Sequence, residues 1–297
     1  MLQSPFAMRA LRISAISFLN TAPLMWDFQR GATPEQPSAV PERLRADFEV
    51  SYTMPSQCAE ALQAGAADIG IIPAISYATM PGLAILPDAA IAAKGAVRSI
   101  LLVSKSPVEE INSVATDTSS RTSVALARIL FQKFWGGVRH LRPLAPDLES
   151  MLRVCDAALL IGDPALRVDR SRHCVYDLAE EWRRATGKPF VFAFWAVRMQ
   201  ALQEVRRGLD MAAVFRESRD GGLEPASVAE IARRWSPYTG LTEPEITTYL
   251  TRHINYFLDA ENLEGLRLFF DYAAECGLIE QPPALRFLGM TASQFVA

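Results

Sequence analysis

The sequence has few of the residues that build metal and redox sites. Its 297 residues include three histidines and four cysteines, and no two of these stand at the spacing of a zinc site or a redox pair. Cys58, Cys155 and Cys276 lie in apolar or helical contexts, which is typical of buried free thiols. We therefore expect no metal site, and a reducing, cytoplasmic location.

The sequence also lacks a long hydrophobic run and an excess of charge of either sign. No apolar stretch approaches the ~18 residues of a membrane span, and the N-terminal residues lack the pattern of a secretory signal, whether the native start is Met1 or Met8. Lysine and arginine total 30 against 33 aspartate and glutamate residues. We expect neither a nucleic-acid nor a membrane partner, so local groups must hold any anionic ligand.

What the sequence does contain is two sets of alternating strands and helices. The expected strands are 11–17, 48–53, 68–72, 97–103, 114–116, 157–161 and 190–197, with helices beginning at Ser56 and spanning 120–135 and 180–186. Such alternation predicts mainly parallel sheets covered by helices. Beyond residue 199 the pattern is helical, at roughly 200–218, 225–235, 242–257 and 261–276, and Gly221-Gly222 is typical of a helix end or loop.

Two unusually long apolar strands, near 97–105 and 189–198, separate the two sets. We interpret them as hinge strands between a discontinuous first lobe, 1–103 and 199–297, and a second lobe, 104–198. The chain length agrees, because 297 residues are more than one core usually serves. In such an α/β protein a ligand binds beyond the carboxyl ends of the strands. One large doubly wound sheet is the alternative.

Three expected helix starts that follow strands are rich in serine, threonine or asparagine: 17–21, 54–57 and 117–123. Free N–H groups and the positive helix end make such places anion sites. The third start is wholly polar and carries five hydroxyls, whereas an N-cap needs one. This surplus indicates a carboxylate or phosphate ligand. The alternatives are a Ser/Thr-rich helix start at 117–123, a simple N-cap at Ser56 and a turn residue at Asn20.

Other catalytic patterns are weak. There is no phosphate-binding glycine loop, and the three histidines, at 140, 173 and 253, are typical of surface or packing residues. Asp163 differs, because it directly follows an apolar strand at its carboxyl end, where it holds the cleft together or caps the next turn. The residues alone thus predict a protein that binds a small carboxylate between two lobes, without a clear nucleophile or base.

Several runs carry a resemblance to a known family: SFLNTAPL (17–24), MPSQCAEALQAGAADIGIIP (54–73), DTSSRTSVAL (117–126), DAALLIGDPAL (156–166) and TGKPFVFAFWAVR (186–198). With the helical tail they resemble the chorismate dehydratase family of menaquinone biosynthesis, the futalosine route, from about residue 10 to 288. The resemblance implies the two-lobed fold of type II periplasmic binding proteins with a helical C-terminal segment. It also implies a hydro-lyase that converts chorismate to 3-[(1-carboxyvinyl)oxy]benzoate and water without a cofactor.

By motif, the resemblance assigns catalysis to Asn20 and Ser99 and substrate binding to Ser119 and Ser120; we add Ser56, Thr118 and Asp163 as binding candidates. Two departures affect the cleft wall: Ala-Ile-Ser-Tyr follows IIP where an acidic residue before the tyrosine is expected, and the run before Ser99 carries Lys94 and Arg98. The alternatives are a non-catalytic carboxylate receptor of the same fold and the sister dihydroxynaphthoate synthase of the same pathway. The oligomeric state stays open.

Overall fold

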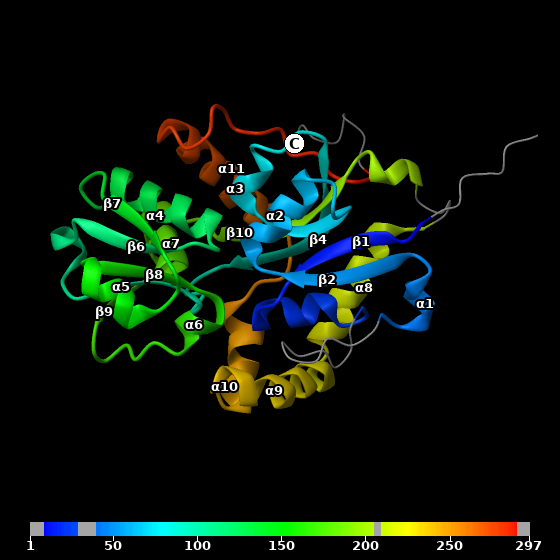
Figure 1. The fold of residues 1–297 in the computed structure, drawn as a ribbon, viewed down its shortest axis with the longest axis horizontal. Coiled ribbons are helices and arrows are strands. Elements are labelled where there is room, and N and C mark those ends of the chain that lie inside the picture. The colour runs from blue at the N-terminus through cyan, green and yellow to red at the C-terminus, as the bar shows by residue number, and fades with distance from the viewer. Residues whose placement is uncertain (1–8, 29–39, 205–208, 290–297) are drawn as a thin grey trace, which may run out of the picture.

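The computed structural model describes residues 9–28, 40–204 and 209–289. They form two five-stranded sheets with helices around them (Figure 1). The first sheet has the order β2-β1-β3-β10-β4, with β1 (Leu11–Ile16), β2 (Phe48–Thr53), β3 (Ile69–Pro73), β4 (Leu83–Ala93) and β10 (Phe190–Arg198). The second has the order β7-β6-β8-β5-β9, with β5 (Ile100–Ser104), β6 (Ser113–Asp117), β7 (His140–Leu144), β8 (Ala157–Ile161) and β9 (Cys174–Asp177).

Both sheets are mixed, not mainly parallel. In the first sheet β1 runs parallel to β2 and β3, whereas β10 is antiparallel to β3 and β4. In the second, β6 is parallel to β7 and β8, whereas β5 is antiparallel to β8 and β9. The reason is the crossing between sheets. The chain leaves the first sheet at the end of β4 and returns there at the start of β10, so these neighbours run in opposite directions.

The chain changes sheet between Ala93 and Ile100, and again between Asp177 and Phe190. The strand expected near 97–105 is the five-residue β5 of the second sheet and is not unusually long, whereas the one expected near 189–198 is the nine-residue β10 of the first sheet. The two-lobed fold expected from the sequence is present. The exact domain boundaries and the hinge strands stay predictions.

Short helices connect the strands: η1 (Leu19–Met25), α1 (Glu42–Arg45), α2 (Pro55–Gln63), α3 (Ala74–Tyr77), η2 (Val108–Glu110), α4 (Arg121–Lys133), α5 (Leu148–Val154), α6 (Gly162–Leu166) and α7 (Leu178–Thr186). The C-terminal part adds η3 (Ala201–Glu204), α8 (Met211–Leu223), α9 (Pro225–Thr239), α10 (Glu243–Thr248), the π-helical turn η4 (Tyr249–His253) and α11 (Ala260–Glu275). Within the described ranges, no helix is both long and apolar enough to cross a membrane.

The structure corrects two helix predictions in the C-terminal part. The helix expected at 200–218 is a short turn at Ala201–Glu204 followed, beyond undescribed residues 205–208, by α8. The helix expected at 242–257 is α10 followed by the π-helical turn, which ends at His253. Gly221-Gly222 lies in the last turn of α8, close to the helix end expected there. A Cβ atom on Gly222 would stand 2.0 Å from the carbonyl oxygen of Pro23, so the glycine is there to let α8 pack directly against η1.

One hydrophobic core runs through both lobes, and a smaller one lies against the second sheet alone. The lobes are joined by aromatic packing: the Trp182 ring of α7 lies 5.3 Å from Phe190 of β10 and 6.5 Å from Phe269 of α11, between centroids. The indole nitrogen of Trp182 also donates to the carbonyl of Pro189 at 3.1 Å. The lobes are therefore firmly packed on this side.

Candidate functional site

A small cavity of ≈ 60 Å³ lies between the two lobes, at strand ends of both sheets. Its walls include the ends of three strands, β1 (Ile16), β3 (Pro73) and β8 (Ile161), as expected for a ligand site of an open α/β sheet. All three expected anion sites border it: Phe18 and Asn20 of the first, Pro55 of the second, and residues 120–123 of the third. Segments about a hundred residues apart thus share one crevice.

The start of α4 faces this cavity with its backbone donors uncapped. Ser120 is the N-cap in an extended conformation, and no side chain accepts from the first turn. Asp117 instead binds the segment before the helix, because its Oδ1 accepts from the N–H of Ser119 at 2.8 Å and from its hydroxyl at 2.7 Å. The Ser119 hydroxyl is therefore engaged as a donor. Thr118 is exposed and does not line the cavity.

The second expected anion site, at α2, differs from the prediction. The helix begins at Pro55 with Met54 as N-cap, and Gln57 Oε1 accepts from the Met54 N–H at 3.0 Å. Ser56 is thus inside the helix and not its N-cap, because Pro55 is favoured at the first position. Pro55 lines the cavity, whereas the half-buried Ser56 does not. The binding role of Ser56 stays a prediction.

Direct contacts hold the lobes together across the cavity. The Phe18 ring lies on Gly162, where an added Cβ would stand 2.7 Å from the ring and φ is +64°. Two hydrogen bonds from backbone N–H groups cross between the lobes here: the Leu19 N–H donates to Asp163 Oδ1 at 3.2 Å, and the Ile75 N–H donates to Thr122 Oγ1 at 3.3 Å. The structure is therefore that of closed lobes.

Asp163 lies where the sequence predicts it, at the carboxyl end of β8 and at the boundary between lobes. Burial raises the pKa of its carboxyl to about 6, while the Leu19 N–H and the charge of Arg167 act in the opposite direction. Buried titratable groups in a cleft are typical of functional sites. Asp163 thus combines a contact that closes the lobes with a proton equilibrium close to neutral pH.

Of the two predicted catalytic residues Asn20 lines the cavity and Ser99 does not, and both act on a third residue, Tyr249 of the π-helical turn. The exposed fractions are 9 % for Asn20, 0 % for Ser99 and 3 % for Tyr249. Burial raises the pKa of Tyr249, and the side chains of Ser99 and Asn20 oppose this shift. The Ser99 Oγ nevertheless has no partner that satisfies hydrogen-bond geometry. An unpaired buried hydroxyl is costly unless it serves a ligand or a mechanism.

Two further residues belong to this region and were not predicted from the sequence, Arg121 and Tyr249. Arg121 lines the cavity at the start of α4 and pairs with Glu60 at 2.7 Å across the lobes; its position within DTSSRTS was a usable signal. Tyr249 had no signal, because an aromatic residue in an apolar helical pattern is typical of core packing. Single π turns are frequent at functional sites, but this one is visible only in the structure.

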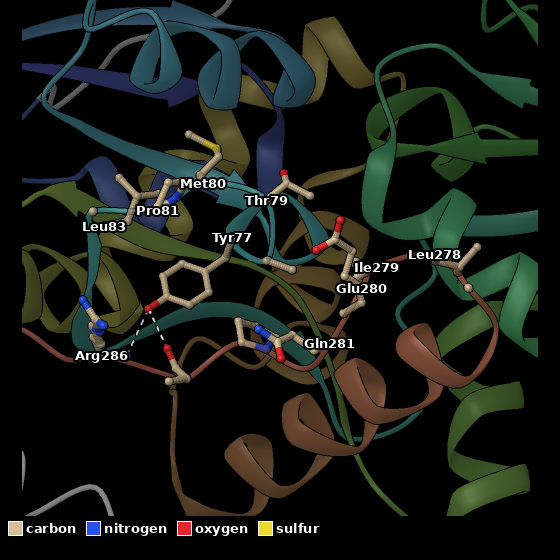
Figure 2. A pocket seen from close by; sticks show the side chains of 15 residues that line it. Tyr77, Thr79, Met80, Pro81, Leu83, Leu278, Ile279, Glu280, Gln281 and Arg286 are labelled. Carbon is tan, nitrogen blue, oxygen red and sulfur yellow. Dashed lines mark hydrogen bonds between the residues drawn. The ribbon is translucent and has the colours of Figure 1, made fainter.

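A larger hollow of ≈ 870 Å³ lies on the first lobe, between the loop after α3 and the C-terminal segment (Figure 2). The Tyr77 hydroxyl accepts from the Arg286 N–H at 3.0 Å and donates to the Ala284 carbonyl at 3.2 Å. Tyr77 thus fixes the C-terminal segment to the lobe. None of the predicted site residues lines this hollow.

Residues 11–275 match the model of the menaquinone biosynthesis family. The chain belongs to this family. Among curated proteins it is similar to the chorismate dehydratase of Thermus thermophilus, with 30 % identity over 250 residues, 75 % of this chain and 85 % of that protein. A chorismate dehydratase of Campylobacter jejuni is 32 % identical over 167 residues, 55 % of this chain and 60 % of that protein. The family resemblance inferred from the sequence runs is confirmed.

Solved structures show the fold of this menaquinone biosynthesis family member. The periplasmic aliphatic sulphonate binding protein SsuA of Escherichia coli superposes with a TM-score of 0.62 at 19 % identity, covering 94 % of this chain and 90 % of SsuA. A protein from Archaeoglobus fulgidus gives a TM-score of 0.68 at 15 % identity, covering 93 % of this chain and 100 % of that one. The periplasmic-binding-protein fold is thereby confirmed; at these identities the likeness extends to the fold alone.

Proposed function

We propose that this protein is a chorismate dehydratase, converting chorismate to 3-[(1-carboxyvinyl)oxy]benzoate and water in the cytoplasm without a cofactor. The observation that carries the proposal is that Asn20 and the uncapped start of α4 line the same cavity between the lobes. Membership of the menaquinone biosynthesis family and the similarity to two chorismate dehydratases support it. Chorismate has two carboxylates, which suits a site built from hydroxyls and backbone donors.

One substrate carboxylate would bind the start of α4. The N–H groups of the first turn, the Ser120 hydroxyl and the Arg121 guanidinium supply donors and positive charge there. Ser119 is better placed to orient the loop than to donate to the substrate, because its hydroxyl already binds Asp117. Thr118 and Ser56 are then outer contacts at most, since neither lines the cavity.

Dehydration removes the proton from the carbon that bears the enolpyruvyl ether and expels the neighbouring hydroxyl as water. The ring becomes aromatic, so the protein needs chiefly to orient the substrate and stabilise developing charge. Asn20 and Ser99 would orient the enolpyruvyl group or the departing hydroxyl. The proton would pass to the carboxylate of the substrate's own side chain and from there to the departing hydroxyl, which leaves as water.

Substrate entry requires the lobes to separate. The cavity of ≈ 60 Å³ is far below the ~300 Å³ or more of ordinary small-molecule sites. The contacts of Phe18 with Gly162 and of Leu19 with Asp163 would therefore break on entry and re-form around the ligand. Closure then excludes water from the reacting groups.

The direct test is to incubate the purified protein with chorismate and to follow the aromatic product by absorbance and mass. We expect Asn20→Ala and Ser99→Ala each to lower kcat by ~10²–10³-fold, as is usual for the loss of one electrostatic contact. Asn112→Ala and Ser171→Ala, at exposed positions of the second lobe, are matched controls that keep wild-type turnover. If both cleft variants stay near wild-type kcat, the catalytic assignment is wrong.

The same assay separates the two alternatives. A non-catalytic receptor binds chorismate and forms no product. The sister dihydroxynaphthoate synthase acts instead on a futalosine derivative, and we expect a catalytic histidine in it. None of the three histidines lines the cavity, and His253 Nδ1 already contacts the Ala96 carbonyl at 2.8 Å. This favours the dehydratase.

A further inference from the structure

The segment that carries the chain from the first lobe to the second has an unusual backbone. Arg98 has a φ of +68°, and of the described non-glycine residues only Asp88 shares a positive φ. For a side chain that is not glycine this left-handed conformation costs ~1–2 kcal/mol, so neighbouring contacts must hold it in place. Ser99, the residue proposed to act on the substrate, follows directly.

The carboxylate of Asp177 holds this turn from the second lobe. Its Oδ2 accepts from the Arg98 N–H at 2.7 Å, and its Oδ1 accepts from the Val97 N–H at 3.1 Å. The same Oδ1 caps α7 by accepting from Ala179 and Glu180, at 3.2 and 3.3 Å. One oxygen thus serves the helix and Val97, and the other serves the strained residue.

Ser99 is held on its other side by the second sheet. Its carbonyl oxygen accepts from the Gly162 N–H at 2.8 Å, next to Asp163 and the cavity. With Arg98 fixed before it and Gly162 bonded to it, the direction of the Ser99 side chain follows from the backbone. Its hydroxyl is fully buried without a hydrogen-bond partner, so the side chain itself has no other bond to fix its place.

We infer that Asp177 is a positioning residue: its carboxylate holds the left-handed turn at Arg98 and so aims the Ser99 hydroxyl at the substrate. This inference rests on the proposed function, in which Ser99 takes part in the reaction. A helix cap alone would not need both oxygens. Asp147, the N-cap of α5, binds the Ser150 N–H with Oδ1 at 2.9 Å and thus caps its helix with one oxygen.

The test uses Asp177→Asn, which keeps an acceptor for the helix cap and puts an N–H₂ donor opposite the Arg98 N–H. Asparagine is as good an N-cap as aspartate, so α7 is retained. We expect kcat to fall about 10²-fold with little change in KM, because a small misplacement of a reacting group has this effect. Asp147→Asn is the matched control and keeps wild-type kcat.

Rescue separates positioning from a general structural role. Arg98→Gly in the Asp177→Asn background should restore most of kcat, because glycine adopts a positive φ without strain. Arg98→Ala removes the same side chain but keeps the strain, so it should restore nothing. In the Ser99→Ala background, Asp177→Asn should cause no further loss. Equal rescue by alanine, or a further 10²-fold loss without Ser99, would overturn the inference.

A readout without substrate keeps the two hypotheses apart. Amide hydrogen exchange of the peptide that spans 97–100 should be faster in Asp177→Asn and return toward wild type with Arg98→Gly. If Ser99→Ala loses turnover while Asp177→Asn keeps both turnover and slow exchange, the inference is wrong and the proposed function stands. If the wild-type protein forms no product from chorismate, the proposed function falls, and unchanged exchange would remove the role of Asp177 as well.

Discussion

Two carboxylates, Asp68 at the edge of the first lobe and Asp163 at the boundary between the lobes, differ in how their charge is compensated. Asp68, just before β3, has a side chain with 0 % exposure and binds Arg9 at 2.6 Å and Arg12 at 3.0 Å. Burial alone would raise its pKa, but the hydrogen bonds and charge of these arginines hold it well below the usual range. The Asp163 carboxylate accepts one hydrogen bond, from the backbone N–H of Leu19, and burial raises its pKa to about 6.

This difference in charge compensation indicates that Asp68 serves the stability of the fold, whereas Asp163 serves the site between the lobes. At Asp68 the charge is fully compensated, so the site stabilises the ionised form and the fold with it. At Asp163 the charge is under-compensated at the place where the lobes meet, which costs stability at neutral pH. Groups with such perturbed pKa values are common at functional sites. The strained backbone of Arg98 and the unpaired hydroxyl of Ser99 are two further features of this kind.

The strongest way to break this comparison is Asp68→Asn. Removing one partner of a buried ion pair costs ~3–5 kcal/mol; because Arg9 and Arg12 are partly exposed and can be hydrated, we expect about 2–4 kcal/mol less unfolding free energy. Urea titration at pH 7 measures the loss, which should vanish as the pH falls toward the lowered folded pKa. Turnover per folded molecule should stay unchanged; a large fall in kcat would tie Asp68 to catalysis.

Asp163→Asn should act in the opposite direction. Burial raises the pKa of the folded-state carboxyl from its ordinary value of 3.8 to about 6, so protonation stabilises the fold, and this contribution is lost as the pH rises through 6. At pH 7.5 the variant should be more stable than wild type, by up to ~3 kcal/mol at ~1.4 kcal/mol per pKa unit. The difference in stability between the variant and the wild type should vanish below pH 4. A variant less stable than wild type at pH 7.5 would contradict this.

Gly162→Ala probes the contact that closes the lobes. The added methyl group meets both a positive φ and the Phe18 ring, so we expect a loss of about 2 kcal/mol in thermal or urea unfolding. Gly277→Ala is the matched control: it has a φ of +69° but nothing within 4 Å of the added Cβ, so only the backbone strain of ~1 kcal/mol applies. Adding Phe18→Leu should recover part of the stability lost in Gly162→Ala, and none of the stability lost in Gly277→Ala.

Arg121→Gln should have the smallest effect. It removes a positive charge at the rim of the cavity, so we expect KM for chorismate to rise about 3–10-fold, equivalent to ~1 kcal/mol, with kcat nearly constant. Glu60→Gln frees Arg121 from its ion pair and should leave KM equal or lower. A KM that does not respond to Arg121→Gln would place the substrate carboxylate away from the start of α4.

Local patterns predicted much of the fold. The strands at 48–53 and 157–161 have the bounds expected, because their apolar or alternating runs end at clear turn signals. The pattern does not predict β4, because Pro87-Asp88 interrupts it, with Asp88 at a φ of +66° and register shifts toward β10. Gly221-Gly222 lies in the last turn of α8, as its local pattern predicts, but only the structure shows that close packing on η1 also requires Gly222.

The sequence by itself determined which segments could bind an anion, since a surplus of hydroxyls before α4 and an acidic residue after β8 are local facts. Only the tertiary structure decided which of these segments share one cavity, that Ser99 acts on Tyr249, and that Asp177 reaches back to Arg98. The physical reason is that hydrogen bonds and pKa shifts depend on distances between atoms, and for residues far apart along the chain the packing of the two lobes sets those distances.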